Sequence, residues 1–161
     1  MVLGLSIQTF TMLHVAISIV GIVAGLVVLY GFFGTTRSGG WTALFLATTI
    51  LTSVTGFLFP SPFGPAHVIG IISLVLLAAA VAALYFYDLA GPWRWVYALT
   101  AICALYLNLF VAVVQAFQKV AVLQPLAPTQ SEPPFQIAQG ALLLLFIVAG
   151  IMAVRRFHPQ T

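Results

Sequence analysis

The stretch TMLHVAISIVGIVAGLVVLYGFF (residues 11–33) contains no charged side chain and decides the class of fold. An apolar run of about 20 residues is long enough to cross the hydrocarbon core of a bilayer as an α-helix. Further runs of the same kind follow it, separated by segments rich in glycine, proline or charge. They cover residues 41–59, 66–87, 95–117 and 136–154.

The composition supports the same class of fold. The 161 residues are 63% hydrophobic and only 4% charged, whereas about one quarter of the residues of a soluble domain are charged. Disorder is excluded as well, because disordered chains combine low hydrophobicity with high charge. We therefore predict an all-α, polytopic membrane helical bundle of about five transmembrane helices, formed by residues 1–161 as a single integral membrane domain.

The basic residues predict how this bundle is oriented. Five spans place the two termini on opposite sides of the membrane, and Lys119 is the only basic residue on the side of the N-terminus. Because Lys and Arg gather in cytoplasmic loops, we predict the N-terminus outside and the C-terminus in the cytoplasm. The net charge of +3 then reflects topology, so no nucleic-acid partner is predicted. The predicted cytoplasmic side carries Arg37, Arg94, Arg155 and Arg156.

Two other features depend on this orientation. Aromatic residues cluster at the predicted cytoplasmic boundary, where Trp and Tyr commonly anchor membrane helices. The predicted outer side holds the longest connection, residues 120–134, which contains four prolines. A connection of this length is typical of either a lid or a semi-rigid strap between two helices, and the sequence leaves both open. The predicted anchors are Trp41, Trp93, Trp95 and Tyr97.

Small and polar side chains form a stripe on the first span. At a helical step of about 100° per residue, Ser18, Gly21 and Gly25 all fall within about 40° of His14. Gly21 and Gly25 form a GxxxG motif, which lets two membrane helices approach closely. Besides the lipid bilayer itself, the expected partner is therefore a second copy bound through Gly21 and Gly25, or another membrane protein.

Polar residues within the spans gather toward the predicted outer side. Polar groups are costly in lipid, so they tend to face the interior of a bundle or a cavity. One interpretation is a polar pocket that opens toward the periplasm. The other is that these groups only join helices through hydrogen bonds or are solvated at the interface. The candidate pocket residues are His14, His67, Asn108, Gln115, Lys119, Gln136 and Gln139.

Within this set, His14 and His67 are the candidate cofactor ligands. Imidazole is the commonest metal ligand and an axial ligand of many haems. Two histidines on different helices suffice for one b-type haem, whereas a copper or zinc site usually needs a third or fourth ligand. The spans contain no Asp or Glu and no catalytic motif, so no catalytic residue is predicted. The cofactor is unknown at this point, with b-type haem left open.

Several short segments of the sequence resemble segments of known proteins. They are Leu13-His14 before the glycine stripe, TGFLFP (55–60), PAHVIG (65–70), YLNLF (106–110), FQKV (117–120) and APTQSEPPF (127–135). Over nearly the whole chain they resemble a group of small, uncharacterised bacterial inner-membrane proteins. That resemblance implies a multi-pass protein of the bacterial inner (cytoplasmic) membrane.

The first of these segments is also faintly similar to membrane b-type cytochrome bundles. Such bundles typically carry two pairs of haem-ligating histidines, and only His14 and His67 match them here. This similarity therefore implies at most one haem.

Two functions are compatible with these patterns. The first is a small non-enzymatic integral membrane protein, an accessory, assembly or self-associating subunit with a polar cluster in the outer leaflet. The second is a haem-, metal- or quinone/lipid-binding membrane protein that uses His14 and His67, with electron transfer as its role if haem is bound. A cavity between the two histidines would favour the second function.

Overall fold

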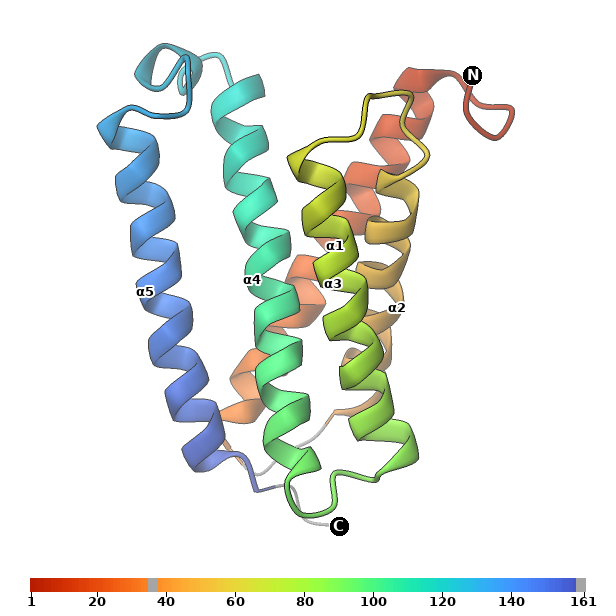
Figure 1. Cartoon of the computed structure of the whole chain (residues 1–161), viewed down its shortest axis with the longest axis vertical. Helices are drawn as coiled ribbons and strands as arrows, with labels where there is room; N and C mark the ends of the chain where they lie inside the picture. Colours follow the sequence, from red (N-terminus) through yellow and green to blue (C-terminus); the bar gives the residue numbers. More distant parts are fainter. Residues whose placement is uncertain (35–37, 159–161) are drawn as a thin grey trace.

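The computed structural model describes residues 1–34 and 38–158 and is all-α (Figure 1). Helices make up 77% of it, and within the described ranges no strand occurs beyond a single bridge between Val2 and Leu5. In chain order the elements are α1 (Ile7–Phe32), α2 (Gly39–Gly56), α3 (Pro65–Val81), the π-helical turn η1 (Ala82–Phe86), α4 (Trp93–Lys119), the 3-10 turn η2 (Gln124–Leu126) and α5 (Pro133–Arg156).

The predicted membrane helical bundle is confirmed. Four helices are long and apolar enough to cross a membrane, namely α1, α3 with η1, α4 and α5. The remaining helix, α2, has 18 residues, five of them threonines, and is not among these four. The exposed faces carry many Leu, Val and Ile side chains, which suits a surface that lipid solvates.

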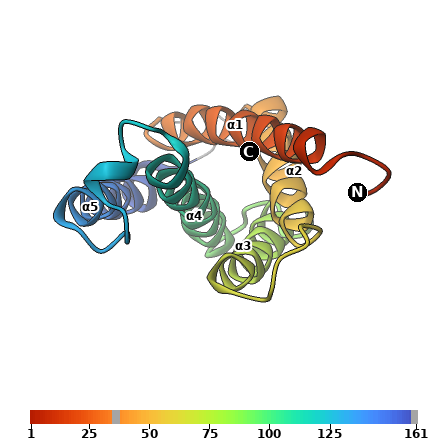
Figure 2. The same cartoon turned by 90° about the horizontal axis from the view of Figure 1, so that it is seen from above.

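The helices α1, α2, α3 and α4 form a ring, and α5 lies outside this ring beside α4 (Figure 2). Contacts between α1 and α4 close the ring. Successive helices run in opposite directions, so the N-terminus lies at the same end as the α2–α3 and α4–α5 loops (Figure 1). We call this the N-terminal end of the bundle. The opposite end carries the last residues of α1, α3 and α5.

The helices extend beyond the predicted apolar runs at several ends. α1 begins at Ile7 instead of residue 11, since the Ser6 hydroxyl accepts a hydrogen bond of 3.1 Å from the Thr9 N–H. α4 and α5 are longer than predicted at both ends. The second predicted span, residues 41–59, ends too late, because residues 57–59 lie beyond the end of α2.

Gly21 and Gly25 are buried within the chain itself. A Cβ atom on Gly25 would lie 2.6 Å from Cδ1 of Leu105 and 2.9 Å from the ring of Phe45. The close helix approach that the GxxxG motif predicts therefore joins α1 to α2 and α4 of the same molecule. Both glycines are therefore occupied by contacts within the chain, and self-association of the protein stays a prediction.

The predicted aromatic anchors differ in their exposure and packing. Trp41 and Trp95 are exposed, and Trp93 stacks on Tyr87 with 3.8 Å between ring centroids. Tyr97 is only 1% exposed and packs edge-on against Phe32, so it belongs to the core and not to the interface. Of the basic residues used to predict orientation, Arg37 lies outside the described residues, and Arg94, Arg155 and Arg156 lie at the end opposite Lys119.

Candidate functional site

His14 and His67 line the same cavity. It has a volume of about 110 Å³ and lies between α1, α2, α3 and α4, in the half of the bundle nearest the α2–α3 loop. Asn108 of α4 lines it as well, and no Asp, Glu, Lys or Arg is among its lining residues. The ring of four helices thus brings three of the predicted pocket residues together from distant parts of the sequence.

The hydrogen bonds of His14 determine which of its ring nitrogens carries a proton. Its Nδ1 atom lies 2.8 Å from the Thr55 hydroxyl. That hydroxyl has one proton, which it donates to the Leu51 carbonyl at 2.7 Å. The Thr55 oxygen therefore accepts from Nδ1–H of His14, so the Nε2 atom of the neutral ring keeps its lone pair.

His67 has the opposite arrangement. The backbone N–H of Gly64 donates to its Nδ1 atom at 3.2 Å, and the backbone N–H of His67 donates back to the Gly64 carbonyl at 2.9 Å. This reciprocal pair caps the start of α3. Because Nδ1 accepts a hydrogen bond, the proton of the neutral ring sits on Nε2. His67 is therefore a donor at the atom where His14 is an acceptor.

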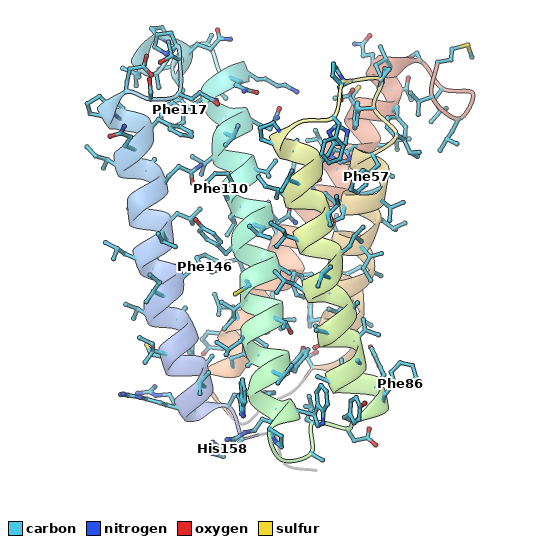
Figure 3. All side chains as sticks on the ribbon, in the orientation of Figure 1. Phe57, Phe86, Phe110, Phe117, Phe146 and His158 are labelled. Carbon is cyan, nitrogen blue, oxygen red and sulfur yellow. The ribbon has the colours of Figure 1, made fainter. Side chains whose placement is uncertain are left out.

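Phenylalanine rings from the end of α2 and the α2–α3 loop hold both histidines in place. Phe63 stacks on His67 with 5.2 Å between centroids, and Phe57 packs against the same ring at 5.6 Å. Phe59 meets His14 edge-on at 5.1 Å. Phe57 lies beside α3 near the N-terminal end of the bundle (Figure 3). The two imidazoles are thus fixed in orientation by packing as well as by hydrogen bonds.

Hydroxyl and amide groups form the deeper wall of the cavity. The Ser53 hydroxyl lies 3.0 Å from the Thr49 carbonyl, to which it donates, and 3.3 Å from the Ser73 hydroxyl, a contact that links α2 to α3. The Oγ1 atom of Thr49 and the Nδ2 atom of Asn108 are enclosed and have no hydrogen-bond partner among the described residues. A buried polar group without a partner costs free energy, so its retention often marks a functional site.

The remaining predicted pocket residues do not line this cavity. Gln139 of α5 donates from Nε2 to the Phe110 carbonyl at 3.1 Å, and so joins α5 to α4. Gln136 donates to the Ser131 carbonyl at 2.7 Å, at the start of α5. Gln115 and Lys119 are exposed. None of these four residues lines the cavity, although the ammonium group of Lys119 lies close enough to His14 to interact with it electrostatically.

The long connection after α4 also stays away from the histidines. Its Gln130 side chain donates to the Val114 carbonyl at 3.0 Å, and Phe117 packs edge-on against Phe135 at 5.5 Å. None of its residues lines the histidine cavity. In this structure residues 120–132 join α4 to α5 as a strap and do not cover the cavity.

Sequence reasoning missed several lining residues, including Thr49, Ser53 and Ser73. Thr49 and Ser53 are four residues apart, so they share a face of α2. This spacing indicates a polar face of α2 that could line a cavity. Thr48, Thr52 and Thr55 form a second polar stripe on the same helix, so the sequence alone does not show which stripe faces the interior of the bundle.

A larger cavity of about 420 Å³ lies at the opposite end of the bundle, lined by Tyr97, Phe157 and the end of α1. None of the candidate pocket residues is among the lining residues of this cavity. The smaller cavity is therefore the better candidate site, because His14, His67 and Asn108 line it.

The histidine cavity does not fit haem or a metal ion as it is arranged. An engineered cavity of about 150 Å³ holds a single benzene, so about 110 Å³ is far too small for a porphyrin. Ligation through Nε2 of His67 would also require the proton on Nδ1, where Gly64 already donates. Within the described ranges no three His, Cys, Asp or Glu side chains come together as a metal site would require.

Comparisons of the chain with protein-family models, with curated proteins and with solved structures return no match.

Proposed function

We propose that the protein is a five-span protein of the bacterial inner membrane, with its N-terminus outside and its C-terminus in the cytoplasm. The path of α2 supports a fifth span, since it runs beside α1 and its 18 residues extend about 27 Å. The described basic residues Arg94, Arg155 and Arg156 support the orientation.

Cysteine labelling tests this topology. In a Cys103→Ala background, Ser61→Cys places a thiol in the α2–α3 loop and Ala90→Cys places one in the turn before α4. A membrane-impermeant maleimide applied to intact spheroplasts is expected to label the first variant and not the second. Labelling of Ala90→Cys, or of both variants, would contradict the orientation or the fifth span.

For the activity, we propose that the protein is a non-enzymatic binding protein for the head-group ring of a quinone. The observation that carries this proposal is the convergence of His14, His67 and Asn108 on one cavity without any charged lining residue. An uncharged site with hydrogen-bonding groups favours an uncharged ligand that has polar oxygens, because a charged ligand would lose its hydration without a counter-charge.

The size and location of the cavity also support a quinone ring. The volume of about 110 Å³ is below the about 150 Å³ of a cavity that holds benzene, so a quinone ring would fill it completely, and its substituents would extend through the side where the cavity is open. The phenylalanine and glycine residues beside the histidines suit a flat ring. A lipid-soluble quinone also reaches a site between membrane helices from the bilayer itself.

The other function considered, a self-associating or accessory subunit, receives no comparable support. Its motivation was the glycine pair, and Gly21 and Gly25 are occupied by contacts within the chain. The polar cluster that motivated a partner is divided between the histidine cavity and hydrogen bonds that join α4 to α5.

Titration of the protein in lipid nanodiscs with decylubiquinone tests the binding proposal. We expect saturable binding at one site per chain, and weaker binding in His67→Phe and in Asn108→Leu. Gln115→Leu is the matched control, because it also replaces an amide on α4 but at an exposed position. Absence of saturable binding, or equal loss of binding in the control, would overturn the proposal.

A further inference from the structure

The two histidines of the cavity present opposite hydrogen-bonding groups. The Nε2 atom of His14 accepts, because Nδ1–H is donated to Thr55. The Nε2–H group of His67 donates, because Nδ1 accepts from the Gly64 backbone. Among the described residues neither Nε2 atom has a hydrogen-bond partner. A ligand that satisfies both must therefore donate at one point and accept at another.

We infer that the cavity binds the reduced, quinol form of the ring more tightly than the oxidised, quinone form, and that His14 determines this preference. The inference rests on the proposed function and specifies which redox form the site selects. It concerns binding alone and involves no electron or proton transfer within the site.

The quinone and the quinol differ in the hydrogen bonds that they can make with the two histidines. The carbonyl oxygens of a quinone only accept, so they pair with Nε2–H of His67 but leave the lone pair of His14 unmet. Each hydroxyl of a quinol both donates and accepts. A quinol can therefore donate to Nε2 of His14 and also accept from His67. The quinone form would additionally place a carbonyl oxygen against the lone pair of His14, which is repulsive.

The other polar groups of the cavity do not reverse this preference. The Asn108 side chain has both a donor and an acceptor group, so it pairs with either form. The hydroxyls of Ser53 and Ser73 likewise adapt by rotation. Discrimination therefore depends on the imidazoles, whose tautomers are fixed by Thr55 and by the backbone of Gly64.

The expected size of the preference follows from one additional neutral hydrogen bond. Such a bond contributes a modest net free energy, which corresponds to about a two- to tenfold ratio of dissociation constants. The preference is therefore measurable but not absolute.

The test compares decylubiquinol with decylubiquinone on the same nanodisc-embedded protein under anaerobic conditions. Wild type is expected to bind the quinol more tightly by about two- to tenfold. His14→Phe is expected to bind both forms equally, since it keeps a flat ring but removes the acceptor. Gln115→Leu is the control and should keep the wild-type ratio.

A second variant keeps the histidine and changes only its tautomer. Thr55→Val removes the oxygen that accepts from Nδ1–H, so the proton of His14 is free to move to Nε2. The ratio of the two dissociation constants should fall toward one in this variant, while the ring of His14 stays in place. Thermal unfolding of each variant shows whether it is folded.

The possible results separate this inference from the proposed function. Equal affinities in wild type, tighter binding of the quinone, or a preference that survives His14→Phe would overturn the inference and leave quinone binding intact. Failure of both forms to bind would overturn the proposed function and the inference with it.

Discussion

The Nδ1 atom of His14 lies 2.8 Å from the hydroxyl oxygen of Thr55, 41 positions further along the chain. This hydrogen bond joins α1 to α2 beside the candidate cavity and fixes the tautomer of His14. Thr55 therefore has two effects. It holds α2 against α1, and it determines which nitrogen of the His14 ring can accept a hydrogen bond.

We predict that Thr55→Val lowers the free energy of unfolding by about 1 kcal/mol, the usual net contribution of one hydrogen bond. The measurement is thermal unfolding in detergent. Thr100→Val is the matched control, because the Thr100 hydroxyl donates only to carbonyls of its own helix, with the nearer one at 2.8 Å. Equal effects of the two substitutions would contradict a special role for the contact between His14 and Thr55.

The class of fold could be predicted from the sequence because uncharged runs of about 20 residues have few alternatives to a membrane helix. The convergence of His14 and His67 was predictable in part, since both occur near the same ends of their helices. The first and last residues of the helices were harder to predict from the sequence. The start of α1, for example, depends on Ser6, whose hydroxyl accepts a hydrogen bond from the Thr9 N–H and adds a turn that hydropathy does not register.

The composition of the site was harder to predict than its existence. Helical periodicity shows that Asn108 and Gln115 lie on similar faces of α4, but not which neighbouring helix each residue meets. The structure separates them because α5 lies outside the ring, so the end of α4 beyond Asn108 runs beside α5 and the strap. The depth of a residue in the membrane could be inferred locally, whereas its neighbours depend on the order of helices around the ring.

Asn108→Leu is expected to raise the thermal stability of the ligand-free protein. The Nδ2 atom of Asn108 is enclosed without a hydrogen-bond partner among the described residues, and replacing such a group by an apolar one of similar size removes a cost of about 1–3 kcal/mol. The same substitution should weaken quinone binding, as expected where a site is retained at the expense of stability. Lower stability of the ligand-free variant would indicate that the amide has a structural partner.

Gly25→Ala should destabilise the bundle by about 1–3 kcal/mol, as other substitutions that overpack a core do. The new Cβ atom would lie 2.6 Å from Cδ1 of Leu105 and 2.9 Å from the ring of Phe45, so these side chains must shift or the helices must move apart. Gly140→Ala is the control on α5, where no atom lies within 4 Å of the added Cβ. We expect Gly140→Ala to leave stability unchanged or to raise it, because alanine favours a helix over glycine. A neutral effect of Gly25→Ala would contradict the packing of the ring.

The turn before α5 should depend on pH through Glu132. Desolvation raises the pKa of its carboxyl group, but hydrogen bonds from Thr129 and Ser131 outweigh this effect and hold the pKa below its ordinary value of 4.5. A lowered pKa means that the charged form stabilises the turn above the ordinary value, and that this stabilisation is lost as the pH falls through the lowered pKa. Amide protection factors for Thr129 and Ser131 should fall on acidification. Glu132→Gln should remove most of this pH dependence, and an unchanged profile in that variant would assign it to another group.

The purified protein should show no haem absorbance, even when it is isolated from haem-replete cells. The reason is the tautomer of His67, whose Nδ1 atom accepts from the Gly64 backbone and so leaves a proton on the nitrogen that iron would need. The measurement is an optical spectrum before and after reduction with dithionite, together with elemental analysis for iron, copper and zinc. A Soret band that disappears in both His14→Ala and His67→Ala would contradict this prediction, because haem ligation by both rings requires the cap of α3 to open and the cavity of about 110 Å³ to expand severalfold. That result would replace quinone binding by electron transfer as the function of the site.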